Sequence, residues 1–239
     1  MSTLPPPKSH PVSWLFMDVG GVLLDDTPLL NQLYRYITDA LVARGVDVSH
    51  AAILEERKRL IAEGIPSVYQ SVLRRFAPDD KTFRAVLGEF RTWLEPRQKE
   101  LNPMLPGVHD ALADLASSYK LAIAANQGAY IRGLLEELGL LRFITSVTLS
   151  EDIGLSKPDP RFFKQMLMDA GAVRENAVMI GDSLANDLRP ANGFGLRTVR
   201  IIAGGDNVRD DSAYSFVDGT VASLQGLPGL LAEWGAGAA

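Results

Sequence analysis

The stretch SWLFMDVGG at residues 13–21 decides the fold that this sequence predicts. Its apolar residues run without interruption from Trp14 to Met17, and an acid, Asp18, and a pair of glycines follow shortly after. A short run that is apolar on both of its faces is typical of a strand inside a parallel sheet, because helices cover both sides of such a sheet. We therefore predict a buried strand over residues 13–19, with Asp18 near its end.

Similar runs recur along the chain and alternate with helical patterns. The further predicted strands span residues 120–126, 144–150, 177–182 and 197–202. The predicted helices between or beside them span residues 108–118, 129–140, 159–170 and 187–194. Alternation of strands and helices predicts right-handed crossovers and an α/β fold with a doubly wound parallel sheet.

One long stretch, from Asp26 to about Leu101, interrupts this alternation. It contains only amphipathic helical patterns, at residues 29–44, 50–62, 68–76 and 81–93. We predict an all-helical subdomain over residues 26–101, inserted into an α/β core that comprises residues 13–25 and 102–239. The alternative is a single α/β domain with additional helices. Residues 1–12 are expected to form a disordered leader, because three consecutive prolines suit neither a helix nor a central strand.

Composition excludes several classes of protein. The chain has 239 residues, 46% of them hydrophobic and 22% charged, which fits one or two globular domains. It has no cysteine, so disulfides and thiolate chemistry are excluded. A net charge of -5 does not favour nucleic acid, and no apolar run is long enough for a membrane helix. The N-terminus does not resemble a signal peptide, so we expect a cytoplasmic protein, and the oligomeric state stays open.

Polar residues gather where the predicted strands end. Asp18 ends the first strand, Asn126 and Gln127 end the second, and Asp182 ends the strand at 177–182. Lys157 lies in a turn just before a helix. In an open parallel sheet, ligands bind beyond the carboxyl ends of the strands, so these groups are expected to converge. Two carboxylates at one site repel each other unless a cation lies between them, and Mg²⁺ suits such oxygen ligands.

Three motifs carry a resemblance to a known family. DVGGVL at 18–23, KPDP at 157–160 and GDSLAND at 181–187 resemble, in this order and spacing, the haloacid dehalogenase (HAD) superfamily. The resemblance implies a Rossmann-like core, an inserted helical cap of the C1 type, and a phosphatase-like hydrolase.

The resemblance also implies roles for individual residues. Asp18 would be the nucleophile that forms an aspartyl-phosphate, and Lys157 would orient it and neutralise charge on the transferring group. Mg²⁺ would be held by the carboxylates of Asp18 and Asp182 and the backbone carbonyl of Gly20, with Asp187 supporting these ligands. The expected partner is a small phosphorylated metabolite.

The sequence departs from the family pattern at two positions. Gly20 stands where most family phosphatases carry a second aspartate that transfers protons, and such catalysis is typically worth about 10²–10⁴ in rate. We therefore expect slow turnover that favours aryl, acyl or anomeric phosphates. Ala125 stands where a hydroxyl residue normally binds the phosphoryl group, and the carboxamides of Asn126 and Gln127 are expected to bind substrate in its place.

These departures leave two alternatives to a phosphatase. A dehalogenase would use the same aspartate on carbon and would not need the missing acid, although it would have no use for a metal site. A catalytically weakened scaffold would bind a ligand or a partner without turnover. The substrate itself cannot be predicted from helical periodicity.

Overall fold

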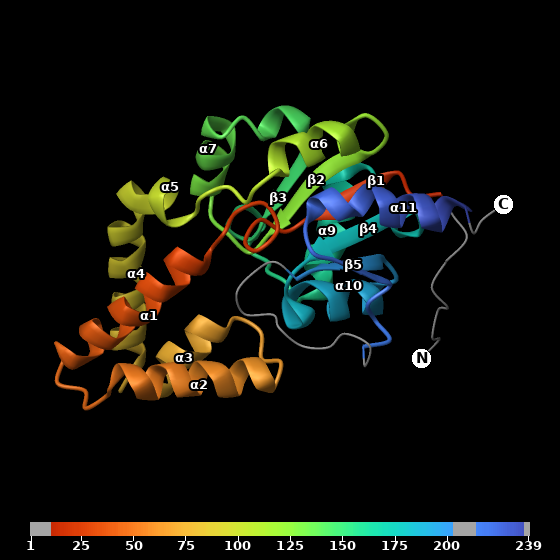
Figure 1. Cartoon of the computed structure of the whole chain (residues 1–239). Coiled ribbons are helices and arrows are strands. Elements are labelled where there is room, and N and C mark those ends of the chain that lie inside the picture. Colours follow the sequence, from red (N-terminus) through yellow and green to blue (C-terminus); the bar gives the residue numbers. More distant parts are fainter. Residues whose placement is uncertain (1–10, 203–213, 237–239) are drawn as a thin grey trace. The chain divides into compact units, whose positions relative to one another are not determined.

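The computed structural model describes residues 11–202 and 214–236, and the chain divides into two compact units (Figure 1). Unit 1 consists of the chain up to Asp25 and from Met104 onward, and unit 2 is Asp26–Pro103. The predicted disordered leader falls mostly on residues 1–10, which lie outside the described residues. In the described part of the chain, no helix has both the length and the apolar composition needed to cross a bilayer.

Unit 1 is built on a parallel sheet of six strands. Their order across the sheet is β3-β2-β1-β4-β5-β6, so β1 lies in the middle, between β2 and β4. The strands are β1 (Trp14–Met17), β2 (Lys120–Ala125), β3 (Ile144–Leu149), β4 (Ala177–Gly181), β5 (Arg197–Ile201) and β6 (Gly219–Val221). This arrangement confirms the predicted α/β fold with a doubly wound parallel sheet.

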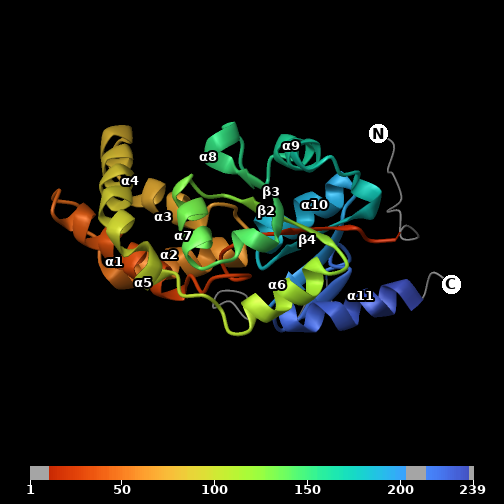
Figure 2. The same cartoon turned by 90° about the horizontal axis from the view of Figure 1, so that it is seen from above.

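Helices cover both faces of this sheet, as Figure 2 shows. One face packs its alternate strand residues against α6, α7 and α11, and the opposite face packs against α9 and α10. The helices and helical turns of unit 1 are α6 (Val108–Ala116), α7 (Tyr130–Glu137), η2 (Leu141–Phe143), α8 (Ser150–Ile153), α9 (Pro160–Ala170), η3 (Arg174–Asn176), η4 (Leu184–Leu188), α10 (Arg189–Phe194), η6 (Leu224–Gly226) and α11 (Leu227–Ala236). Burial on both faces explains why the strands read as continuous apolar runs.

The five predicted strands all form, and each ends one or two residues earlier than predicted. The residues beyond these ends, including Asp18, Asn126 and Asp182, leave the ladder and carry the polar groups that we expected there. The predicted helix at 187–194 begins earlier, as the π-helical turn η4, and continues as α10. The sequence patterns predict no element at β6, α8 or α11.

Unit 2 contains helices and no strand. Its elements are α1 (Thr27–Val42), α2 (His50–Ala62), α3 (Val68–Phe76), α4 (Asp80–Leu94), η1 (Glu95–Arg97) and α5 (Gln98–Leu101). Two of these helices begin with a side-chain cap, because Ser49 Oγ accepts from the backbone N–H of Ala52 and Asp79 Oδ1 accepts from that of Thr82. The unit has a hydrophobic core of its own, in which Ile37, Ile53 and Val72 are fully buried.

Candidate active site

Asp18 and Asp182 follow two neighbouring strands. β1 and β4 pair in parallel, with Met17 opposite Ile180, and the backbone N–H of Asp18 donates to the carbonyl of Ile180 over 2.9 Å. Asp182 comes directly after Gly181, the last residue of β4. Because parallel strands end at the same edge of a sheet, two carboxylates that are far apart in the sequence leave the sheet together.

The turn η4 brings a third carboxylate to the same place. Ser183 begins this turn, and its Oγ accepts from the backbone N–H of Asn186 over 3.2 Å. The backbone N–H of Asp187 donates to the carbonyl of Ser183 over 3.0 Å. In return, Asp187 Oδ2 accepts from the backbone N–H of Ser183 over 3.1 Å. The turn therefore folds the fully buried carboxylate of Asp187 back toward the end of β4.

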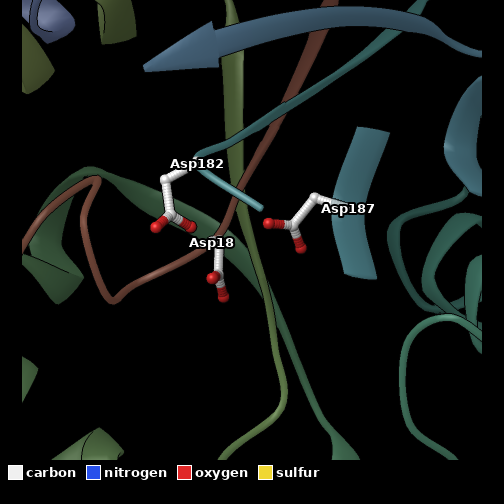
Figure 3. A group of neighbouring side chains, drawn as sticks. All are labelled: Asp18, Asp182 and Asp187. Carbon is white, nitrogen blue, oxygen red and sulfur yellow. The ribbon is translucent and has the colours of Figure 1, made fainter. Parts of the chain in front are cut away.

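The three carboxylates converge. Asp18, Asp182 and Asp187 each offer an oxygen, and these oxygens lie within 4.8 Å of one another. In Figure 3, the carboxylate of Asp187 points toward that of Asp182, and Asp18 lies between and below them. The predicted meeting of Asp18 with Asp182 is thus present in the structure, and Asp187 joins them.

Two glycines allow this close approach. A Cβ atom on Gly21 would lie 2.7 Å from Oδ2 of Asp182, and one on Gly181 would lie 2.5 Å from Oδ2 of Asp187. Both distances are shorter than any side chain tolerates, and Gly21 also has a positive φ of 68°. The sequence motifs contain both glycines but do not by themselves indicate this steric role. The signal that could have shown their role is that each lies next to a carboxylate-bearing turn.

Lys157 joins two of these carboxylates through its ammonium group. Its Nζ donates to the carbonyl of Ala124 over 2.7 Å. The same atom lies 3.0 Å from Oδ1 of Asp18 and 2.5 Å from Oδ1 of Asp187. The Lys157 side chain is only 1% exposed, whereas that of Asp18 is 19% exposed. Asp18 is therefore the member of this ion-paired group that a ligand can reach from solvent.

Burial and neighbouring charges shift the pKa values of Lys157 and Asp187 in opposite directions. Burial lowers the pKa of Lys157, but the neighbouring carboxylates of Asp18 and Asp187 outweigh it and leave that pKa above its usual value. Burial raises the pKa of Asp187 to about 6, against the lowering effect of Lys157. Asp18 adds a further repulsive charge that raises it. One cation thus serves two carboxylates, which leaves negative charge at the site for a second cation.

The donor set fits a hard divalent ion. Asp187 is fully buried, and its Oδ1 lies 2.5 Å from the ammonium of Lys157. The glycines at positions 21 and 181 leave space for carboxylate oxygens that a Cβ atom would fill. Carboxylate oxygens are the ligands that Mg²⁺ prefers. Asp18, Asp182 and Asp187 could therefore hold this ion together.

The other predicted site residues lie around this group. Gly20 is in the turn after β1, where it forms a bridge with Leu24, and a metal contact of its carbonyl stays a prediction. Ala125 is fully buried in the hydrophobic core and brings no hydroxyl. Gln127 has its Oε1 buried without a hydrogen-bond partner among the described residues, and its carbonyl accepts from the backbone N–H of Glu151 over 3.4 Å.

The carboxamide of Asn126 has both of its polar atoms in hydrogen bonds. Nδ2 donates to the carbonyl of Lys157, and Oδ1 accepts from the backbone N–H of Lys157, each over 2.7 Å. The sequence predicts a contact of Asn126 with the substrate, and that contact stays a prediction. The link to Lys157 is not predictable from the sequence, because it depends on which segments meet in space.

Several relatives that the chain resembles in sequence are named as phosphatases. A glyceraldehyde 3-phosphate phosphatase of Methanocaldococcus jannaschii is 41% identical over 227 residues, which cover 90% of this chain and 95% of the relative. One from Methanopyrus kandleri is 29% identical, covering 80% and 84%. A phosphoglycolate phosphatase of Mesorhizobium japonicum is 26% identical, covering 81% and 83%.

Solved structures share the fold. A HAD phosphatase from Thermococcus onnurineus superposes with a TM-score of 0.68 at 24% identity, covering 92% of this chain and 98% of the other. A 2-haloacid dehalogenase from Pseudomonas syringae gives a TM-score of 0.62 at 24% identity, covering 93% and 99%. The sequence profile of haloacid dehalogenase-like hydrolases matches residues 15–201, which include all three motifs. The resemblance is thereby confirmed, and the chain belongs to the haloacid dehalogenase-like hydrolase family.

Proposed function

We propose that this protein is a Mg²⁺-dependent phosphatase of small phosphorylated metabolites that works through an aspartyl-phosphate. The observation that carries the proposal is the convergence of Asp18, Asp182 and Asp187 on one site, with the ammonium of Lys157 between two of them. The names of the relatives, which act on glyceraldehyde 3-phosphate or phosphoglycolate, support phosphate esters as the substrate class.

In the first step, a carboxylate oxygen of Asp18 attacks phosphorus, and the bond from phosphorus to the ester oxygen breaks. The ester oxygen leaves with the bonding electron pair. Lys157 keeps the Asp18 carboxylate in place, because its Nζ lies 3.0 Å from Oδ1 of Asp18 and donates to the carbonyl of Ala124. Such positioning lowers the barrier because the reacting atoms are held together before the reaction.

In the second step, water attacks phosphorus and the bond to Asp18 breaks, which releases inorganic phosphate and restores the carboxylate. When bound, Mg²⁺ would neutralise charge on the phosphoryl oxygens during both steps. The residues that would hold it are Asp18, Asp182 and Asp187, together with the carbonyl of Gly20.

Two residues of this chain set the rate and the substrate class. Gly20 has no side chain, so nothing at that position can protonate the leaving oxygen or take a proton from water. Ala125 offers no hydroxyl to the phosphoryl group. Aryl, acyl and anomeric phosphates should therefore react faster than alkyl phosphates, because their leaving groups depart without a proton.

We further propose that unit 2 serves as the cap of this enzyme. Its support is the position of residues 26–103 in the sequence, between β1 and the rest of unit 1, and its helical composition. The cytoplasmic location stays a prediction.

The test is hydrolysis of p-nitrophenyl phosphate and acetyl phosphate, with and without Mg²⁺. We expect slow turnover that a chelator stops and that Asp18→Asn abolishes. Asp110→Asn is the matched control, because its side chain is 97% exposed on α6, and it should keep wild-type turnover. Bound Mg²⁺ without any turnover would favour the scaffold, and metal-free release of chloride from 2-chloropropionate would favour the dehalogenase.

A second variant tests the account of Gly20. Gly20→Asp restores a carboxyl group two positions after the nucleophile. We expect the turnover of alkyl phosphates such as glyceraldehyde 3-phosphate to rise by up to about 10²-fold, and that of p-nitrophenyl phosphate to rise far less. Equal effects on both substrates would contradict the role given to this position.

A further inference from the structure

Asn126 lies at the end of β2, where the family pattern and the missing hydroxyl of Ala125 would place a substrate contact. The structure instead gives its carboxamide two short hydrogen bonds to one residue, Lys157, which is 31 positions away in the sequence. The bonds run in opposite directions, from the backbone N–H of Lys157 to Oδ1 and from Nδ2 to the carbonyl of Lys157. The amide therefore fixes the backbone on both sides of the Lys157 Cα atom.

The same strand also fixes the other end of the Lys157 side chain. Its Nζ donates to the carbonyl of Ala124, two residues before Asn126. The end of β2 thus holds the base of this side chain through a carboxamide and its tip through a carbonyl. Between these anchors, the ammonium is aimed at Oδ1 of Asp18 and Oδ1 of Asp187.

Burial alone does not account for the two bonds. Asn126 is an exposed residue, so its carboxamide would find water partners if it were turned outward. The two hydrogen bonds from this carboxamide to the backbone of Lys157 instead fix the position of the loop that carries Lys157. We propose that Asn126 is a positioning residue, which acts on the reaction through Lys157 and not through contact with the phosphoryl group.

This inference rests on the proposed function and is tested first by kinetics with acetyl phosphate and Mg²⁺. If Asn126 acts through Lys157, Asn126→Ala lowers kcat by roughly 100-fold, because small displacements of catalytic groups have effects of that size. KM stays within about twofold of the wild-type value, since no substrate contact is lost. A rise in KM with unchanged kcat would overturn the proposal.

The decisive measurement is a double-mutant cycle with Lys157→Met. Without the ammonium there is nothing left to position, so adding Asn126→Ala should change the residual kcat by less than about twofold. Independent effects that multiply would show that Asn126 works without Lys157, and the proposal would fail. Gln165→Ala is the matched control, because that amide bonds to Asp169 on the same helix, and it should leave kcat unchanged.

A second variant covers the case in which Asn126→Ala does not fold, as judged by thermal unfolding. Asn126→Asp keeps an acceptor for the N–H of Lys157 but cannot donate to its carbonyl, and it should lower kcat as well. Wild-type kcat in this variant would contradict the proposal.

A binding measurement separates this inference from the proposed function. Beryllium fluoride with Mg²⁺ mimics a phosphoryl group on a carboxylate, and its affinity can be measured by calorimetry even if the wild type turns over no substrate. Asn126→Ala should weaken this binding by roughly tenfold or more in the wild-type background and by less than about twofold with Lys157→Met. If the protein turns over no substrate but Asn126→Ala weakens beryllium fluoride binding only when Lys157 is present, the proposed phosphatase function fails and the role of Asn126 stands. If the protein turns over substrate but the effect of Asn126→Ala does not depend on Lys157, only the role of Asn126 fails.

Discussion

At the residue scale, the site depends on small residues as much as on charged ones. Gly181 and Gly21 carry no chemistry, yet each lets a carboxylate approach the backbone more closely than any side chain would allow. Gly181 has an extended backbone within β4, so its requirement for glycine is purely steric. This separates it from Gly21, where a positive φ adds a conformational requirement.

Gly181→Ala should therefore damage the site without straining the strand. The new Cβ atom would lie 2.5 Å from Oδ2 of Asp187 and would displace this fully buried side chain. We expect a loss of roughly 1–3 kcal/mol in the free energy of unfolding and a drop in Mg²⁺ affinity of about tenfold or more. Thermal unfolding and calorimetric Mg²⁺ titration measure both effects.

The control is Gly133→Ala in α7, where a Cβ atom would meet nothing within 4 Å. This variant should keep its Mg²⁺ affinity and gain roughly 0.5–1 kcal/mol, because alanine suits a helix interior better than glycine. Wild-type Mg²⁺ affinity in Gly181→Ala would show that Asp187 does not take part in the site.

Protonation of Asp187 gives a second prediction at this scale. Burial raises its pKa to about 6, so in the metal-free protein the protonated form persists above the pH at which an ordinary carboxyl group ionises. Mg²⁺ requires the ionised form. Its affinity should therefore be full well above pH 6 and should fall by up to about tenfold per pH unit below that value.

Calorimetric titration of Mg²⁺ at several pH values between about 5 and 8 measures this dependence. Asp187→Asn is the control, because it removes the titrating group and should flatten the dependence while weakening binding at high pH. An affinity that is constant between about pH 5 and pH 7 in the wild type would contradict the prediction.

At the element scale, the turn η4 positions the carboxylate of Asp187 at the site. Ser183→Ala removes the cap of this turn, in which Oγ accepts from the backbone N–H of Asn186 over 3.2 Å. We expect a loss of roughly 0.5–2 kcal/mol in stability together with a fall of about tenfold in Mg²⁺ affinity.

Ser49→Ala is matched to this change, because Ser49 Oγ accepts from the backbone N–H of Ala52 over the same 3.2 Å at the start of α2. Its stability loss should be similar, and its Mg²⁺ affinity should equal that of the wild type. Equal Mg²⁺ affinities in both variants would mean that the cap of η4 only stabilises the fold.

The elements also show what sequence patterns can and cannot predict. The five core strands were predictable because burial on both faces leaves continuous apolar runs. β6 has only three residues, Gly219–Val221, and none of them is fully buried, so it leaves no such run. The link from Asn126 to Lys157 was not predictable either, since it depends on which segments meet in space and two backbone groups take part in it. Asp18 with Asp182 was predictable, because both follow buried strands of one parallel sheet.

At the scale of the whole molecule, the residues of the candidate metal site all belong to unit 1, whereas unit 2 has a separate hydrophobic core. Ile53→Ala in that core should lower the stability of unit 2 by roughly 2–5 kcal/mol, because Ile53 is fully buried. At temperatures where the variant is folded, its Mg²⁺ affinity should stay within about twofold of the wild-type value. Scanning calorimetry and Mg²⁺ titration test this, and a large loss of affinity in the folded variant would show that the two units are coupled.

The central place of β1 has a consequence for how the protein is made. Trp14–Met17 leaves the ribosome well before its neighbours in the sheet, Lys120–Ala125 and Ala177–Gly181. Because both pairings of β1 are so distant in the sequence, β1 stays without partners until β2 has been synthesised, and without β4 for longer still. A nascent chain that stops before Asp187 would carry Asp18 but could not assemble the site, so the three carboxylates meet only after Asp187 has been synthesised.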